Sequence, residues 1–211
     1  MAGTPLPMFP LSAVLFPHGS MSLHVFEARY RALVRDCLAG DRRFGVVLIE
    51  RGSEVGGGDQ RAMLGTRSVI VRAGELPDGR WLLAVLGEAV LEVDEWLPDD
   101  PYPRARVHER QVPPGRPPEV GELLATATGR VRHARALLAE HGGAPPLAPG
   151  ASLDGGGDAT VAAWQLCGAA PLSAYDAQRL LAAADVAERL RLLTVIVEEL
   201  ELDLRRMLAA E

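Results

Sequence analysis

Residues 21–38, MSLHVFEARYRALVRDCL, contain the change of hydrophobic period that decides the fold. Over residues 21–26 apolar and polar side chains alternate with a period of two, which predicts a half-buried strand. From Tyr30 onward the apolar residues recur at helical spacing, at positions 30, 33, 34, 37 and 38. Gly40 then marks the end of the helix. The stretch therefore predicts a strand followed directly by an amphipathic helix.

Short strands continue on the C-terminal side of this helix. A continuous apolar run at residues 44–49 is typical of a strand covered on both sides. The turn sequence LPDG at 76–79 joins two strands into an antiparallel hairpin. The predicted strands that follow the first apolar run cover residues 64–73, 80–86, 88–97 and 102–112. Six or seven short strands with one inserted helix predict a closed or partly open β-barrel.

The sequence changes character after residue 112. Residues 113–118, PPGRPP, read as a proline-rich linker, and no strand pattern follows it. Helices are predicted from about residue 120 to 141, from 158 to 167, after Ser173 and after Asp185. Residues 142–157 form a Gly/Pro-rich loop. We predict an α+β protein with a β-barrel subdomain at 1–112, a linker at 113–118 and a helical bundle at 119–211.

The last helix carries an apolar seam with alternating spacings of four and three residues, typical of a and d positions. Such a seam packs either inside an intramolecular bundle or against a second copy as a coiled coil. Because other helices are at hand, we expect the bundle and a monomer. The seam consists of Val186, Leu190, Leu193, Val197, Leu200, Leu204 and Met207.

Composition excludes several enzyme classes. The chain has 211 residues and a net charge of −6, and all 22 of its basic residues are arginine. A P-loop needs a lysine at the nucleotide phosphates, a Ser-Lys peptidase needs one as base, and a Schiff-base enzyme needs one too. We therefore expect a protein that is not an enzyme and that takes no cofactor.

No metal site or membrane span is expected either. The five histidines show no metal-binding spacing, and the distant Cys37 and Cys167 are expected to be buried thiols. No apolar run approaches the roughly 18 residues of a membrane span, and no signal peptide is evident. These features predict a cytoplasmic protein without a membrane partner.

Arginines cluster on one predicted strand, where Arg104 and Arg106 share a face with His108 and Arg110. Basic stripes on small β-barrels can bind RNA. Aromatic residues make up only 5% of the chain and acids are interleaved throughout, so solvated faces explain the pattern better. We expect no nucleic-acid partner, although an RNA-binding protein stays open as an alternative.

Five segments, in order, resemble the Lon protease N-terminal domain family. The second contains an F-E-x-R-Y pattern at a strand-to-helix junction. The segments are residues 7–11 (PMFPL) with 14–17 (VLFP), 26–34 (FEARYRALV), 64–66 (LGT) with 68–70 (SVI), 76–80 (LPDGR) with 85–87 (VLG), and 176–181 (DAQRLL) with 187–190 (AERL).

This resemblance implies a PUA-like barrel followed by a helical bundle. In Lon proteases that unit helps to engage unfolded substrates and precedes an ATPase. Here the chain ends at Glu211 without an ATPase or peptidase module, so we expect a stand-alone bacterial member. Its expected function is to recognise unfolded or extended polypeptide, as an adaptor for a separate protease. The insert at 142–157 departs from the family pattern.

Two sets of residues follow from this hypothesis. Aromatic residues and methionine suit promiscuous apolar recognition, although core packing is the alternative for each; the peptide-binding candidates are Phe16, Met21, Trp81 and Trp96. A second set is expected to hold the fold and comprises Pro10, Pro17, Phe26, Glu27, Arg29, Tyr30 and Gly65. A small-molecule pocket in the barrel is a third possible function, for which the sequence offers no polar anchors.

Overall fold

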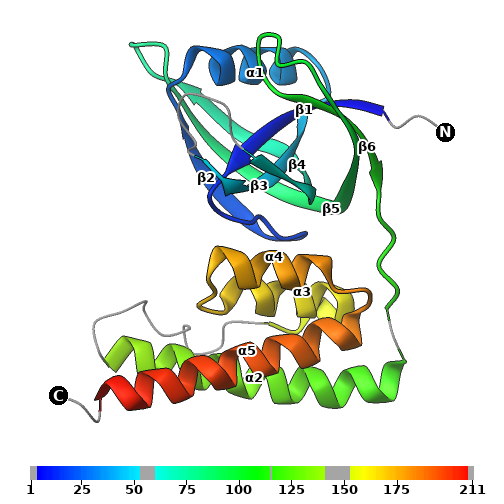
Figure 1. Ribbon diagram of the computed structural model, residues 1–211, viewed down its shortest axis with the longest axis vertical. Helices are drawn as coiled ribbons and strands as arrows, with labels where there is room; N and C mark the ends of the chain where they lie inside the picture. The colour runs from blue at the N-terminus through cyan, green and yellow to red at the C-terminus, as the bar shows by residue number, and fades with distance from the viewer. Residues whose placement is uncertain (1–3, 53–59, 115, 141–152, 209–211) are drawn as a thin grey trace. The chain divides into compact units, whose positions relative to one another are not determined.

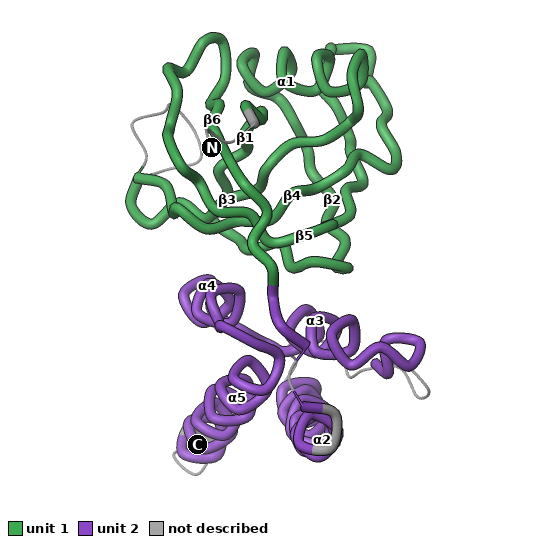
Figure 2. Tube along the Cα trace, turned by 90° about the vertical axis from the view of Figure 1, so that its right-hand side faces the viewer, with its two compact units in different colours: residues 1–111 green, residues 112–211 purple. Residues whose placement is uncertain are grey.

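The computed structural model describes residues 4–52, 60–114, 116–140 and 153–208. It divides the chain into two compact units, residues 1–111 and 112–211, which Figure 2 shows in different colours. Most of the loop predicted at 142–157 lies outside the described residues.

The first unit is a six-stranded mixed sheet with one helix, as Figure 1 shows. The strand order is β2-β5-β4-β3-β1-β6, and an additional β5–β6 pairing closes the sheet on itself. The elements are β1 (Thr4–Leu11), β2 (Ser20–Val25), α1 (Ala28–Ala39), β3 (Arg43–Arg51), β4 (Gln60–Glu75), β5 (Trp81–Leu97) and β6 (Arg104–Glu109).

The long strand β5 corrects the prediction of two separate strands at 80–86 and 88–97. Its first part pairs with β2 and its second part with β6, while β4 follows both. Gly87 lies between the two predicted segments and allows a close approach of the backbone. A Cβ atom at Gly87 would overlap the carbonyl oxygen of Phe16.

Strand β1 was not among the predicted strands, because Pro5, Pro7 and Pro10 interrupt its pattern. It nevertheless pairs in parallel with β3 through residues 8–11 and antiparallel with β6 through residues 4–7. Proline is tolerated in a strand where its missing N–H would not have joined the ladder. The structure meets that condition along this strand.

Helix α1 confirms the predicted amphipathic face, with Tyr30, Leu33, Val34 and Cys37 buried. The ring of Tyr30 stacks on Phe9 with centroids 4.1 Å apart. Burial raises the pKa of the Cys37 thiol to about 12, so this cysteine is unreactive at neutral pH. Glu27 is the N-cap residue of this helix, and its side chain makes no capping hydrogen bond.

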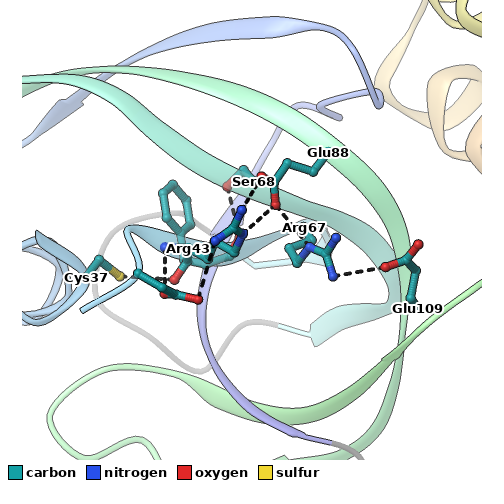
Figure 3. A network of polar contacts seen from close by, with 8 residues as sticks. Cys37, Arg43, Arg67, Ser68, Glu88 and Glu109 are labelled. Carbon is teal, nitrogen blue, oxygen red and sulfur yellow. Dashed lines mark hydrogen bonds and ion pairs between the residues drawn. The ribbon is translucent and has the colours of Figure 1, made fainter.

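An arginine–glutamate network ties four strands together, as Figure 3 shows. Glu88 on β5 accepts two hydrogen bonds of 2.8 Å from Arg43 on β3. Arg67 on β4 donates to Glu88 at 3.1 Å and pairs with Glu109 on β6 at 3.0 Å. The hydrogen bonds from Arg43 are the main reason why the pKa of Glu88 is held below its ordinary value.

Glu88→Gln should lower the free energy of unfolding by about 1–3 kcal/mol at neutral pH, because it removes charge-assisted hydrogen bonds. The contribution of Glu88 is fully present above the ordinary glutamate pKa of about 4.3 and is lost as pH falls through the lower folded value. Urea melts at pH 7 and pH 3 should therefore show a difference between wild type and variant that shrinks in acid.

The matched control for this network is Glu95→Gln on the same strand. Glu95 forms an exposed ion pair with Arg106 at 3.3 Å, and such pairs stabilise proteins little. Its substitution should leave the melting curve nearly unchanged. An equal loss for both variants, independent of pH, would show that the Glu88 network is not the source of the effect.

The second unit is helical in its described part. It contains α2 (Pro117–Glu140), η1 (Gly155–Gly157), α3 (Ala159–Ala169), α4 (Ala174–Ala182) and α5 (Val186–Leu208). Helix α2 begins inside the predicted linker, because a proline in the first turn needs no amide donor. All three predicted helix starts have their expected capping hydrogen bonds, made by Asp158, Ser173 and Asp185.

The seam of α5 is buried within the chain itself. Val186, Leu190, Leu193 and Val197 are fully buried, whereas Leu200 and Leu204 are partly exposed. Helix α5 packs mainly along α2 and also contacts α3 and α4, as Figure 1 shows for α2. The apolar face predicted from the sequence therefore points to the chain's own helices.

A buried cation lies at the turn between α4 and α5. The guanidinium carbon of Arg189 sits 3.5 Å from the ring centroid of Trp164. Its Nε donates to the carbonyl of Leu180 at 3.0 Å and its Nη2 to that of Ala183 at 3.4 Å. Arg189 therefore caps the end of α4 while it packs on an aromatic face.

Candidate functional site

One edge of β2 carries main-chain groups that face away from the sheet. His18 donates to the carbonyl of Gly87 at 2.8 Å, and Gly87 donates to that of Gly19 at 2.9 Å. Because ladder bonds alternate along an antiparallel strand, Met21 and the following odd-numbered residues bond to β5. The N–H and C=O groups of Ser20, Ser22 and His24 therefore point away from β5. Within the described residues, β2 pairs with β5 alone.

Residues 8–11 of β1 line the same cavity as β2 but pair with β3. Met8 donates its N–H to the carbonyl of Pro103 at 2.8 Å, so its main-chain groups point away from β3. By alternation, those of Pro10 do so too, and Pro10 has no N–H to donate. We call the gap between β2 and residues 8–11 of β1 the open seam.

A cavity of about 230 Å³ opens at this seam. Its walls come from both strands and from the start of α1, and its one acidic lining residue, Glu27, has an arginine partner. Glu27 and Arg29 form an ion pair at 3.0 Å, and Arg29 also lies 4.4 Å from the ring centroid of Tyr30. The lining residues are Phe9, Leu11, Ser22, Leu23, His24, Val25, Phe26, Glu27 and Tyr30.

Exposed apolar side chains lie beside β2, at its C-terminal end and on the neighbouring strand β5. Phe26 is 52% exposed, with its ring 6.1 Å from that of His24 in an edge-on arrangement. Leu82 is 51% exposed and lies opposite His24 on β5. Leu86, opposite Ser20, is also exposed. The edge of β2 is therefore bordered by apolar surface, which is typical of an interaction site.

The structure distributes the four predicted peptide-binding residues over different places. Phe16 is buried, whereas Met21 and Trp81 are half-buried and pack against the core beneath α1. Trp96 packs against a second core cluster, and the guanidinium of Arg61 lies 4.9 Å from its ring centroid. The four side chains do not form one surface, and their role in binding stays a prediction.

The residues expected to hold the fold have mixed surroundings. Pro10, Pro17 and Tyr30 are buried, and a Cβ atom at Gly65 would overlap the carbonyl oxygen of Val46. Phe26 differs from them, because half of its surface is exposed. Sequence reasoning missed the open seam. The available signal was a large aromatic residue at the junction of a strand and a helix.

The basic stripe on β6 is paired with acids of β5. Arg106 pairs with Glu95 at 3.3 Å, and Arg110 pairs with Glu92 at 3.5 Å. His108 lies 2.8 Å from Asp94. Because Arg106 and Arg110 are paired with acids, these two arginines offer little net positive charge for a phosphate backbone.

Within the described residues there is no group of three or more histidine, cysteine or acidic side chains placed to hold a metal ion. Among those residues no helix is long and apolar enough to cross a membrane. Cys167 is buried like Cys37, and burial raises its thiol pKa to about 12.

The open seam offers apolar side chains in its cavity and main-chain hydrogen-bonding groups on β2, and both suit binding.

The family model for the ATP-dependent protease La (LON) substrate-binding domain matches residues 5–199. The chain belongs to this family. The match extends over the open seam and both units of the Lon-type chain, so it covers the fold as well as the candidate site.

Individual relatives agree with this assignment. A Lon N-terminal domain protein from Xanthomonas campestris has a TM-score of 0.64 and 28% identity, covering 91% of this chain and 98% of that one. Lon protease 2 of Herpetosiphon aurantiacus is 29% identical over 203 residues, which are 92% of this chain and 24% of the relative. The N-terminal domain of a Mycobacterium avium complex Lon protease shares the fold, with a TM-score of 0.61 and 16% identity.

A LON peptidase N-terminal domain and RING finger protein of Schizosaccharomyces pombe is 26% identical over 123 residues, 53% of this chain. The chain spans about a quarter of the length of this protein and of the Herpetosiphon protease, with 25% and 24% covered. The Lon-type similarity therefore concerns the substrate-binding domain of longer proteins.

Proposed function

We propose that the chain is a non-catalytic Lon-type module that recognises unfolded or extended polypeptide. The observation that carries this proposal is the cavity at the open seam, whose lining combines apolar side chains such as Phe9 and Leu11 with polar ones, and which has the half-exposed Phe26 at its rim. Unfolded chains differ from folded proteins in displaying apolar side chains and unpaired main-chain groups together. The seam presents the complementary features side by side, since apolar walls lie next to the free edge of β2.

The module acts as an adaptor in the bacterial cytoplasm, delivering bound chains to a separate protease. The relatives named Lon protease contain the matching region as a fraction of their length, which supports a role as one recognition part of a proteolytic system. In architecture, the closed sheet supports a PUA-like barrel, and the packing of α5 along α2 supports a helical bundle.

Phe26→Ser should weaken the binding of an unfolded protein about tenfold, because it removes apolar surface from the rim of the cavity. Fluorescence anisotropy with a labelled, reduced and alkylated model protein measures this affinity, which should be micromolar for wild type. Tyr175→Ser is the matched control, since Tyr175 is a 71% exposed aromatic residue in the helical unit. Equal binding by all three proteins would contradict the proposed site.

The same assay separates polypeptide from RNA as the ligand. Polypeptide binding should depend weakly on salt, whereas RNA binding falls steeply with salt as phosphate counterions are released. Titrations at 50 mM and 300 mM salt with each labelled ligand give the comparison. Tight, salt-sensitive RNA binding that disappears when Arg104 and Arg106 are replaced would overturn the proposed function.

A further inference from the structure

We propose that the free edge of β2 receives a segment of the bound polypeptide as an added strand, with one of its apolar side chains in the seam cavity. This inference rests on the proposed function and specifies how it is carried out. The segment is extended, pairs through its main chain, and is selected for shape and apolar character at a single position.

The hydrogen-bonding pattern of β2 defines the occupant. The outward N–H and C=O groups of Ser20, Ser22 and His24 recur at every second residue of a regular strand. A second extended chain presents donors and acceptors at the same repeat, which is the basis of recognition by strand addition. A compact small molecule cannot match three successive positions of this ladder.

The edge has none of the usual devices that prevent strand pairing. Free edges in natural proteins are commonly blocked by proline, by charged side chains or by bulges within the strand. Residues 20–25 of β2, SMSLHV, contain no proline, acid, lysine or arginine. The proline of the seam is Pro10, which lies on β1. An incoming strand therefore finds a complete ladder on the β2 side.

The cavity accounts for the side-chain preference. Its volume of about 230 Å³ is below the roughly 300–1,000 Å³ of pockets that enclose whole drug-sized ligands. It suits a side chain that projects from a strand lying along the edge. Glu27 and Arg29 neutralise each other at 3.0 Å, so the cavity presents no uncompensated charge to attract a charged residue. Because most of the lining residues, among them Phe9 and Leu11, are apolar, the cavity favours an apolar side chain.

Selective N-methylation of a peptide tests strand addition on the wild-type protein. The probe is a labelled nine-residue peptide of alternating leucine and serine, methylated at the main-chain nitrogen of either the leucines or the serines. Only one of these sets faces β2 in an added strand, because main-chain groups alternate between the two edges. The two methylated peptides should differ in affinity about tenfold or more. Equal effects of both methylation patterns would overturn the inference.

Ser22→Pro tests the same edge from the protein side. It removes an outward N–H but leaves the bonds to β5, and proline is accepted at edge positions. The variant should bind the unmodified peptide about tenfold more weakly than wild type, and Ser22→Ala, which loses the hydroxyl but keeps the N–H, should bind it more tightly than Ser22→Pro does. Circular dichroism melts check folding, and if the proline variant does not fold, the methylated peptides decide alone.

The possible failures are distinguishable. If Ser22→Pro folds and binds the peptide as wild type does, strand addition is wrong while polypeptide recognition stands. If wild type binds neither the peptide nor the unfolded model protein, the proposed function itself is wrong. Light scattering tests a second copy of the chain as occupant. A wild-type dimer that Ser22→Pro converts to a monomer would assign the edge to self-association and overturn the inference.

Discussion

Leu193→Ala should lower the free energy of unfolding by about 2–5 kcal/mol, through lost transfer energy and the cavity left behind. Leu193 is fully buried in the middle of α5, within a helical unit of the same chain. That loss is a large share of a typical stability of about 5–15 kcal/mol. Because the packing is intramolecular, the effect should not depend on protein concentration. Thermal melts over a hundredfold concentration range measure both quantities.

Leu200→Ala is the matched comparison on the same helix and the same seam. Leu200 is partly exposed, so less apolar surface is lost and the substitution should destabilise less than Leu193→Ala. A coiled-coil dimer behaves otherwise, since its stability falls on dilution. Midpoints that rise with concentration in wild type, together with a dimer mass, would show that α5 packs against a second copy.

Arg189→Ala should lower the free energy of unfolding by a similar amount, about 3–5 kcal/mol. Loss of the side chain leaves the carbonyls of Leu180 and Ala183 without their donor and creates a cavity. Arg189 is fully buried, and it bonds the carbonyls of Leu180 and Ala183 while packing on Trp164. Arg189→Lys should not restore stability, since an ammonium lacks the planar fork and stacks poorly. Denaturant melts measure these losses.

Arg191→Ala provides the control for a cation on the same helix. Arg191 forms an exposed ion pair with Glu119, and pairs of that kind contribute little. Its loss should barely change the denaturation midpoint. A similarly small effect of Arg189→Ala would mean that neighbouring groups satisfy the two carbonyls without the guanidinium.

Local features of the fold were predictable because they depend on residues close in sequence. The amphipathic face of α1 follows from the spacing of Tyr30 and Leu33, and the helix starts at Asp158 and Ser173 follow from capping chemistry. The continuity of β5 was not predictable, because Gly87 is needed for the approach of Phe16 from another part of the chain.

The candidate site was harder to predict for the same reason. Whether Pro10 interrupts the sheet depends on whether its missing N–H would have faced a paired strand. That is set by the bond from Met8 to Pro103, about 95 residues away in sequence. A half-exposed Phe26 and a buried Phe16 are indistinguishable by hydrophobicity alone. Both the effect of Pro10 and the exposure of these two phenylalanines depend on how strands far apart in sequence pair with each other.

The place of β1 also constrains how the protein is made. Thr4 lies opposite Val107, so the first strand cannot complete its pairing until β6 has been synthesised. Translation adds about 5–20 residues per second, which leaves β1 waiting on the order of 5–20 s. During that interval Met8 and Phe9, both buried in the finished sheet, have only part of their final surroundings. The pairing of β1 therefore makes completion of this sheet depend on a strand that is synthesised about 100 residues later.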